Sequence, residues 1–445
     1  MTPVGRALSV PALLAVAVGN FLVAFDASAV NVIVTPIIED LGGSHTALQW
    51  VLDGYTIPLC AFVFLAGALG DRFGSFRVYK IATTVFLLAS VACALAPDLG
   101  WLISARLVQG AAASFMLPMT LSIIAEAEPD AARRARAVGV WGVVGGVAIA
   151  AGPILGGVLG SAWSWRMVFW VNLPICAVAL LVLARQRSPE NPDARTVPLL
   201  SQALLLVFLF AATWALISTA HGGSAPMVSG AAWAIMAVSA IALVIADRRA
   251  RTPMVPTVLW RDCAFVRLVG SGAIYQFCSY GGLLVFTLWA SSVRPGSALE
   301  AGSLVLPCSA AWLCGNLTVW LVRPEWRRKA IVAGTTLGLC GAVSVVSSGS
   351  AGAMLVMGMI AAGLASGLLA SSLSAEAMSK APERAAGSAS GLFNTSRQFG
   401  MVVAIATIGG MTVQSGMATQ FVIVGIGYLL IAALALPRAA ATTAH

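Results

Sequence analysis

The fold of this chain is decided by a short polar stretch, GALGDRFGSFR at residues 67–77. It joins two apolar runs, 48–69 and 78–96, and each run is long enough to cross a bilayer as a helix. Charged side chains such as Asp71 and Arg72 must therefore lie at a membrane face. We expect the stretch to form a short interfacial hairpin between two membrane-spanning helices.

Three glycines in the stretch, Gly67, Gly70 and Gly74, permit a tight turn and let neighbouring helices approach closely. An aspartate can cap a helix end and accept hydrogen bonds from arginine, and Arg77 adds a second arginine. The pattern G-x-L-G-D-R-x-G-x-x-R resembles the signature loop of the major facilitator superfamily, between its second and third spans. Ser75-Phe76 departs from that pattern, because the family usually carries basic residues there.

The composition excludes a soluble globular protein. Of the 445 residues, 59% are hydrophobic and 10% are charged, whereas a soluble chain carries about 25% charged residues. The eight cysteines form no C-x-x-C pair and mostly lie in apolar runs, so we interpret them as small buried residues. We expect no cofactor, no metal site and no nucleic-acid partner, since the basic residues behind the net charge of +9 gather in alternate loops.

The apolar runs predict about fourteen helices, because runs of this length cross lipid as helices. The expected spans are 10–35, 48–69, 78–96, 99–125, 137–160, 167–184, 197–220, 227–246, 264–291, 300–322, 330–348, 352–374, 387–411 and 417–436. Most arginines and lysines fall in the loops after even-numbered spans and in the tails, and the opposite loops hold only Arg166 and Arg294. The positive-inside rule then predicts a multi-pass cell-membrane protein with both termini in the cytoplasm.

The resemblance implies an all-α major facilitator fold of two six-helix lobes, so about fourteen spans leave two extra helices. We expect an amino-terminal lobe at 1–190, two linker helices at 191–250 and a carboxyl-terminal lobe at 251–445. The runs 197–220 and 227–246 contain no charged residue, and we interpret them as lipid-facing filler.

Ionisable side chains inside a span are costly and are functional by default. Asp26, Asp53 and Arg106 lie roughly 13, 8 and 10 Å below the same face by the helical rise. Asp26 lies in FDASAVNV, residues 25–32, which resembles the first-span motif of the fourteen-spanner drug:proton antiporters, including actinomycete antibiotic-resistance exporters. In that family the Asp is tied to substrate recognition or proton coupling, and Asn31 of the same motif is a cavity candidate. A permanent structural pair with Arg106 is the alternative.

Two further motifs accompany Asp26. Asp53 lies in QWVLDGY, residues 49–55, which resembles the second span of that family. Asp53 either takes part in proton coupling or is an interfacial cap that reaches water. Arg106 and Gln109 share one helical face in RLVQG, which resembles the superfamily's fourth-span motif. Because an arginine does not release a proton at physiological pH, we interpret Arg106 as tuning a neighbouring carboxylate. Structural pairing is again the alternative.

The fifth expected span carries Gly152, Pro153, Gly156 and Gly157. Gly-Pro bends a span and removes a backbone donor, while the glycines permit close helix contact. The sequence G-P-x-x-G-G resembles the motif that separates exporters from importers in this superfamily, with Ala148 replacing a usual upstream glycine. Export is therefore expected, and a generic tightly packed helix is the alternative.

The carboxyl-terminal half carries a second polar face. Asn394, Arg397 and Gln398 lie in a run that resembles the thirteenth span of the same family, and Tyr275 and Gln276 lie in the ninth. We take all five as cavity candidates. Arg397 either attracts an anionic or carbonyl-bearing substrate or packs against another helix.

Taken together, the residues and the resemblance predict a secondary transporter, because no Walker-type ATP motif is present. The expected activity is proton-coupled export of a small organic compound such as an antibiotic or toxic amphiphile, by a lipid-embedded monomer. A transporter of a specific metabolite and a non-transporting membrane sensor are the alternatives. An enzyme is disfavoured, because His45, His221 and His445 fall in loops or the tail and no nucleophile–base cluster is present.

Overall fold

The computed structural model describes residues 9–43, 45–128, 130–186, 198–220, 226–255, 257–294, 298–321, 326–348, 352–380, 386–411 and 416–435. Its helices are α1 (Val10–Leu41), α2 (His45–Ala61), α3 (Val63–Phe73), α4 (Ser75–Ala94), α5 (Leu99–Ala127), α6 (Ala131–Ala162), α7 (Met167–Trp170), α8 (Asn172–Leu183), α9 (Leu199–Ala220), α10 (Pro226–Arg249), α11 (Thr257–Arg261), α12 (Cys263–Val293), α13 (Ala298–Leu321), α14 (Arg327–Ser347), α15 (Ala353–Lys380), α16 (Ala386–Met411) and α17 (Met417–Ala435). His45 starts α2, and His221 and His445 lie outside the described residues.

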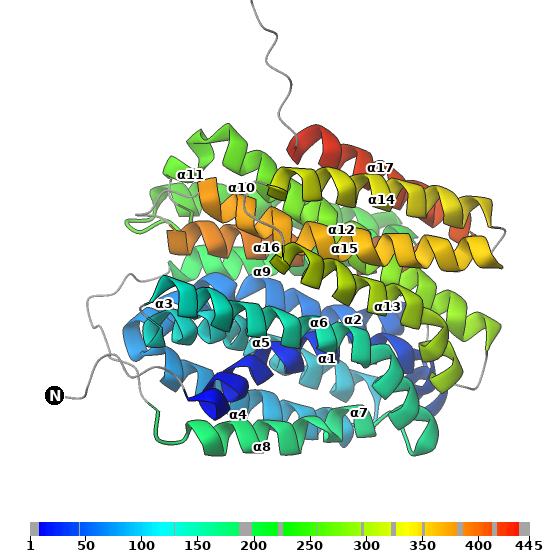
Figure 1. The fold of residues 1–445 in the computed structure, drawn as a ribbon, viewed down its shortest axis with the longest axis horizontal. Helices are drawn as coiled ribbons and strands as arrows, with labels where there is room; N and C mark the ends of the chain where they lie inside the picture. Colours follow the sequence, from blue (N-terminus) through cyan, green and yellow to red (C-terminus); the bar gives the residue numbers. More distant parts are fainter. Residues whose placement is uncertain are drawn as a thin grey trace, which may run out of the picture.

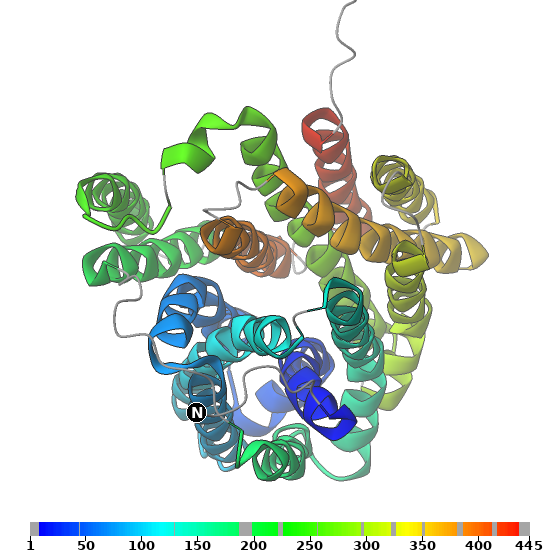
Figure 2. The same ribbon diagram turned by 60° about the vertical axis from the view of Figure 1, so that its left-hand side comes forward.

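The helices gather into two groups that lie side by side (Figure 1). Helices α1–α8 surround one hydrophobic core and α12–α17 surround another, and the view along the bundle separates the blue-to-teal group from the yellow-to-red group (Figure 2). Leu284, Met401 and Ile405 from the second group join the core of the first. The groups therefore touch through apolar side chains of α12 and α16.

Aspartates start several of the long helices. Asp98 accepts a hydrogen bond from the backbone N–H of Trp101 at 2.8 Å, at the start of α5. Asp262 does the same for the N–H of Ala264 at 2.8 Å, at the start of α12. Each satisfies a donor that the first helical turn leaves unpaired. These caps fix where the helices that carry Arg106 and Tyr275 begin.

Eleven helices of the described residues are long and apolar enough to cross a membrane. Two of the expected continuous spans were wrong in detail, because each is broken. The span 48–69 is divided at Phe62 into α2 and α3, with Pro58 in the last turn of α2. The span 167–184 is divided into α7 and α8, and Pro174 lies in the first turn of α8. Backbone N–H groups in a first turn have no partner within the helix, so proline can replace a residue there without breaking a helical hydrogen bond.

The polar stretch at 67–77 is more compact than the expected hairpin. Helix α3 continues to Phe73, Gly74 alone breaks the chain with φ +85°, and α4 starts at the next residue. Gly70 packs on Met119, since an added Cβ would lie 2.5 Å from its Sδ atom. Ser75 Oγ donates to a carboxylate oxygen of Glu126 at 2.5 Å. The side chain of Asp71 lies outside those described, Arg72 and Arg77 are exposed, and Gly67 has open space around it.

The two linker helices differ from each other. Helix α10 packs on α9 and exposes Val238 and Ile241 widely, as filler would. Helix α9 also packs on α2 and α16, and its Leu209 is buried in a small core. Gln202 Nε2 on α9 donates to Ala61 O at 2.6 Å, at the break between α2 and α3. The interpretation of α9 as mere filler was therefore wrong.

The cysteines are free thiols in the described structure, and five of them are buried as expected: Cys60, Cys93, Cys176, Cys278 and Cys308. The expectation was wrong for Cys314 and Cys340, which lie in apolar helices but are exposed on their outer faces. An apolar run shows that a residue lies in the bilayer, but it does not show which side of the helix faces lipid.

Candidate functional site

Asp26, Arg106 and Gln109 form one closed polar cluster inside the first helix group. Asp26 on α1 and Arg106 on α5 form an ion pair between Oδ2 and Nη1, and their side chains are 0% and 1% exposed. Gln109 Nε2 donates to the other oxygen, Oδ1 of Asp26, at 3.0 Å, and Gln109 Oε1 accepts from Arg106 Nη1 at 2.8 Å. The structure therefore joins three of the residues predicted from the sequence.

Neighbouring helices complete this cluster with groups that the sequence did not single out. Ser90 Oγ on α4 accepts from Gln109 Nε2 at 2.9 Å and from Asn172 Nδ2 on α8 at 3.3 Å. Arg106 Nε donates to Val51 O at 3.2 Å, and the guanidinium lies 4.2 Å from the centre of the Tyr55 ring. Single Ser and Asn residues are common in spans, so only their burial here marks them.

The close contact of α2 and α5 places Arg106 under Tyr55. At Gly110 an added Cβ would lie 2.0 Å from Tyr55 O, so only glycine fits there. Arg106 lies one helical turn earlier on the same face. A buried ion pair is costly to form and strongly destabilising to break by removing one partner. Neither Asp26 nor Arg106 could lose its charge here without leaving the other buried and unpaired.

Asp53 does not reach water in this conformation, although the depth estimated from the sequence suggested that it could. Its side chain is fully buried; Oδ1 accepts from Thr56 Oγ1 at 2.9 Å, and Oδ2 has no partner among the described residues. Gln49, one turn earlier on the same face of α2, packs on Gly409 of α16. The interfacial-cap interpretation was wrong, because the opposite helix group covers this face.

The glycine-rich helix α6 packs tightly on α1. At Gly152 an added Cβ would lie 1.9 Å from Ser28 Oγ, and at Gly156 it would lie 2.9 Å from Ala29 O. Pro153 faces the other group: a Cβ added at Gly302 on α13 would lie 2.2 Å from Pro153 O. Gly157 is buried beside them. Helix α6 thus contacts both α1 and α13 through close backbone approaches at glycine positions.

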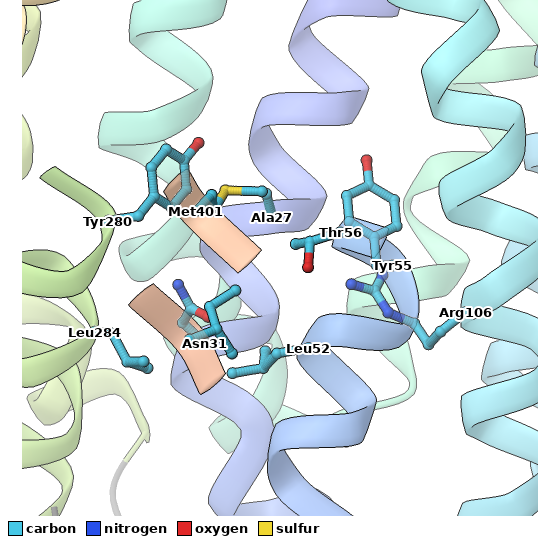
Figure 3. A pocket seen from close by; sticks show the side chains of 10 residues that line it. Ala27, Asn31, Leu52, Tyr55, Thr56, Arg106, Tyr280, Leu284 and Met401 are labelled. Atoms are coloured by element: carbon cyan, nitrogen blue, oxygen red, sulfur yellow. The ribbon is translucent and has the colours of Figure 1, made fainter. Parts of the chain in front are cut away.

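A small cavity lies where the two groups meet, beside Arg106 (Figure 3). Asn31 and Tyr55 line it from the first group, and Tyr280, Leu284 and Met401 line it from the second. Its volume is about 10 Å³, which is room for about one water molecule. The predicted cavity residue Asn31 does face this cavity, which is closed in this conformation.

Arg397 is the centre of a second polar cluster, in the carboxyl-terminal group. Its Nε donates to Gln276 Oε1 on α12 at 3.2 Å, and its guanidinium carbon lies 5.5 Å from the centre of the Tyr275 ring. Gln398 Oε1 is buried without a partner among the described residues, while Asn394 on the same helix does have an interaction partner. Three of the five predicted residues, Arg397, Tyr275 and Gln276, therefore come together, apart from Asp26 and Arg106.

A larger cavity of about 750 Å³ opens on the side of the first group, between α3, α4, α5 and α9. Its lining is apolar except for Arg77. None of the residues of the two polar clusters lines it, so size alone does not make it the functional site. Among the described residues, no group of three or more His, Cys, Asp or Glu side chains is placed to bind a metal ion.

This architecture, two helix groups with a buried ion pair and a closed cavity between them, is that of a membrane transporter. Residues 16–405 match the Major Facilitator Superfamily, and the chain belongs to this family.

Curated relatives include several resistance proteins of actinomycetes. The chain is 31% identical over 402 residues to the multidrug resistance protein Stp of Mycobacterium tuberculosis, covering 90% of this chain and 75% of that protein. It is 29% identical to the methylenomycin A resistance protein of Streptomyces coelicolor, covering 96% and 92%. It is 28% identical to the tetracenomycin C resistance and export protein of Streptomyces glaucescens, covering 90% and 75%.

Solved transporter structures share the fold. The crystal structure of the peptide transporter POT in complex with sulfate superposes with a TM-score of 0.70 at 15% identity, covering 97% of this chain and 96% of that one. A mutant of the nucleoside transporter NupG gives a TM-score of 0.62 at 14% identity, covering 95% and 98%. At this identity the likeness concerns the fold alone.

Proposed function

We propose that this transporter exports a small organic compound, such as an antibiotic or toxic amphiphile, in exchange for protons. The observation that carries the proposal is the buried cluster of Asp26, Arg106 and Gln109. The proposal is also supported by the relatives, several of which are named for resistance or export.

The cluster explains how a proton would be coupled to movement. In the present arrangement both oxygens of Asp26 accept hydrogen bonds, from Arg106 and from Gln109, as an ionised carboxylate would. A proton on Asp26 removes its charge and leaves Arg106 without a counter-ion in a place shielded from water. Helices α1 and α5 then lose the attraction that joins them, so protonation favours a different packing of the lobe.

Substrate entry requires the lobes to part. The cavity between them holds about 10 Å³, whereas pockets for drug-sized ligands measure about 300–1,000 Å³. Leu284, Met401 and Ile405 close it from the second lobe. Opening that contact would expose Arg106 and Asn31, and Asp53 on the neighbouring helix would lose the cover of α16. We therefore assign Asp53 as a second candidate for the coupled proton.

The proposed topology has fourteen spans. Eleven of these spans are the long apolar helices, and the other three are the α2–α3 pair, the α7–α8 pair and α16. The proposed lobes are residues 1–190 and 251–445, and the linker helices lie in 191–250. Both termini are proposed to face the cytoplasm. The protein is proposed to be a monomer. The orientation is supported by the scarcity of basic residues in the loops expected outside, which hold only Arg166 and Arg294. Cysteines placed at Arg249 and at Arg294 should react with an impermeant reagent from opposite sides of the membrane.

The function is tested by flux in proteoliposomes with a pH gradient of either sign and a panel of antibiotics. Asp26→Asn should abolish transport driven by the gradient while the protein remains folded, as judged by circular dichroism. Asp53→Asn tests the second candidate in the same assay. Unchanged gradient-driven transport by Asp26→Asn would remove Asp26 from the mechanism, and absence of any proton-linked flux in the wild type would reject the proposal.

A further inference from the structure

Two arginines inside helices of the two lobes, the buried Arg106 and the partly buried Arg397, have opposite kinds of partner. Arg106 is neutralised by the carboxylate of Asp26. Arg397 contacts neutral groups: Gln276 Oε1, the Tyr275 ring and, at 3.5 Å, Ser374 Oγ. Within the part of the chain that the structure describes, no carboxylate lies within ion-pair distance of Arg397.

A charge in that position requires an explanation. Arg397 is eleven residues beyond the start of α16, which places it about 17 Å into the bundle at the helical rise. It is too far from the helix end for its guanidinium to reach the membrane surface easily. Arginine stays protonated in proteins, so the charge is permanent. An intramembrane cation without a counter-ion is costly and marks a candidate functional site.

The geometry around Arg397 leaves a binding face. Gln276 holds the Nε edge of the guanidinium, and the long contact to Ser374 leaves the terminal nitrogens weakly engaged. The side chain is partly exposed, so a ligand has access to it. A guanidinium presents a planar fork that matches a carboxylate with two parallel hydrogen bonds.

Helix α12 connects this face to the place where the lobes meet. Gln276, which holds Arg397, and Tyr280 are four residues apart, so they share one face of α12 and lie about 6 Å apart along the helix axis. Tyr280 lines the interlobe cavity and packs edge-on against Trp312, with ring centres 5.6 Å apart. A compound with an apolar or aromatic body could contact these rings while its anionic end reaches Arg397.

We propose that Arg397 binds the anionic group, a carboxylate or its equivalent, of the transported compound. Substrates are then small organic anions with an apolar body, and Gln276 is a positioning residue that orients the guanidinium. This inference rests on the proposed function, since it concerns the substrate site of the same transporter. If Arg397 only packed against another helix, it would bind no anion. A measurement of anion binding therefore distinguishes a binding role from a packing role.

The test uses pairs of probes that differ only in charge: benzoate and benzamide, 2-naphthoate and 2-naphthamide, 4-phenylbutyrate and its amide. Affinity is measured by titration calorimetry on purified protein in detergent at pH 7.5, with no gradient. The wild type should bind at least one carboxylate about tenfold or more tightly than its amide, as expected for a hydrogen bond to a charged group. Arg397→Gln should remove this preference, and Arg397→Lys should keep part of it.

Three further variants make the result specific. Arg267→Gln removes an exposed arginine from α12 and should behave as the wild type. Gln276→Leu keeps the charge of Arg397 but not its orientation, and should reduce the preference even if Arg397→Gln does not fold. Arg166→Gln removes an arginine of the first lobe, where it pairs with Asp40, and should keep the preference.

The outcomes are separable. If no carboxylate binds the wild type more tightly than its amide, or if the preference survives in both Arg397→Gln and Gln276→Leu, the anion site is rejected. If the preference is present and depends on Arg397, but vesicles show no proton-linked flux, the anion site stands and the proposed antiport fails.

Discussion

The ion pair between Asp26 and Arg106 allows a quantitative test of the buried cluster. Asp26→Asn keeps the shape of the side chain and removes its charge, and Arg106→Gln removes the charge while leaving a shorter polar side chain. Both partners are almost completely buried, so each single variant leaves the other charge without a counter-ion and without water. Breaking a buried pair in this way destabilises a protein by about 3–5 kcal/mol.

The double variant, Asp26→Asn with Arg106→Gln, should be less damaging than the sum of the two. It leaves neutral amides that can still bond to Gln109, whose amide already contacts both partners. Residues in direct contact show interaction energies of about 0.5–3 kcal/mol, and we expect this pair near the upper end. The exposed pair of Asp40 and Arg166 is the matched control, where a surface ion pair should contribute about 0–1 kcal/mol.

The assay is reversible unfolding in detergent micelles, followed by tryptophan fluorescence and circular dichroism at pH 7.5. The predicted coupling of the two charges is refuted if each single variant loses less unfolding free energy than the control pair. It is also refuted if the loss in the double variant equals the sum of the losses in the two single variants, because the two charges would then not depend on each other. The proposed coupling of protonation to helix packing would then have no energetic basis.

Three other changes test the packing around the site. Gly152→Ala should cost about 1–3 kcal/mol of stability and slow transport, because its Cβ meets a serine hydroxyl on α1, whereas Gly142→Ala, with open space, should be neutral in the same melting and flux assays. Gly74→Ala should cost about 1–3 kcal/mol in melting experiments because of its positive φ, whereas Gly67→Ala should match or slightly exceed the wild type. Gln202→Leu should leave the carbonyl at the break between α2 and α3 without its donor, and amide hydrogen exchange at residues 62–66 should rise; unchanged exchange would show that α9 does not hold the break.

Much of the site could be predicted because it depends on spacing along one helix. The three-residue interval between Arg106 and Gln109 puts them on one face, and the structure shows both bonded to Asp26. The close contacts at Gly152 and Gly156 follow equally from residue type, since only glycine lets helices approach so closely. Composition alone was enough to place the chain in lipid.

The parts that sequence could not supply depend on how helices are rotated and covered. The depth estimated for Asp53 measured its distance from a helix end, but Asp53 is buried on a helix, α2, against which α16 packs from more than 300 residues further along the chain. Ser90 and Asn172 could not be distinguished from other polar residues in spans until Gln109 was seen to lie against Ser90. The similar depths of Asp26 and Arg106 could not show that the two helices turn these side chains toward each other.

The two polar clusters together define the energetics of the proposed cycle. Moving one proton inward while one neutral compound leaves transfers one charge, which an interior-negative potential favours by about 2.3 kcal/mol per 100 mV. If the exported compound is the anion that Arg397 accepts, its outward movement is equivalent to a second inward positive charge, and the same potential contributes about twice as much. On the proposed assignment of Arg397, the negative charge of the compound would therefore let the membrane potential drive it out, in addition to the proton gradient proposed to act at Asp26.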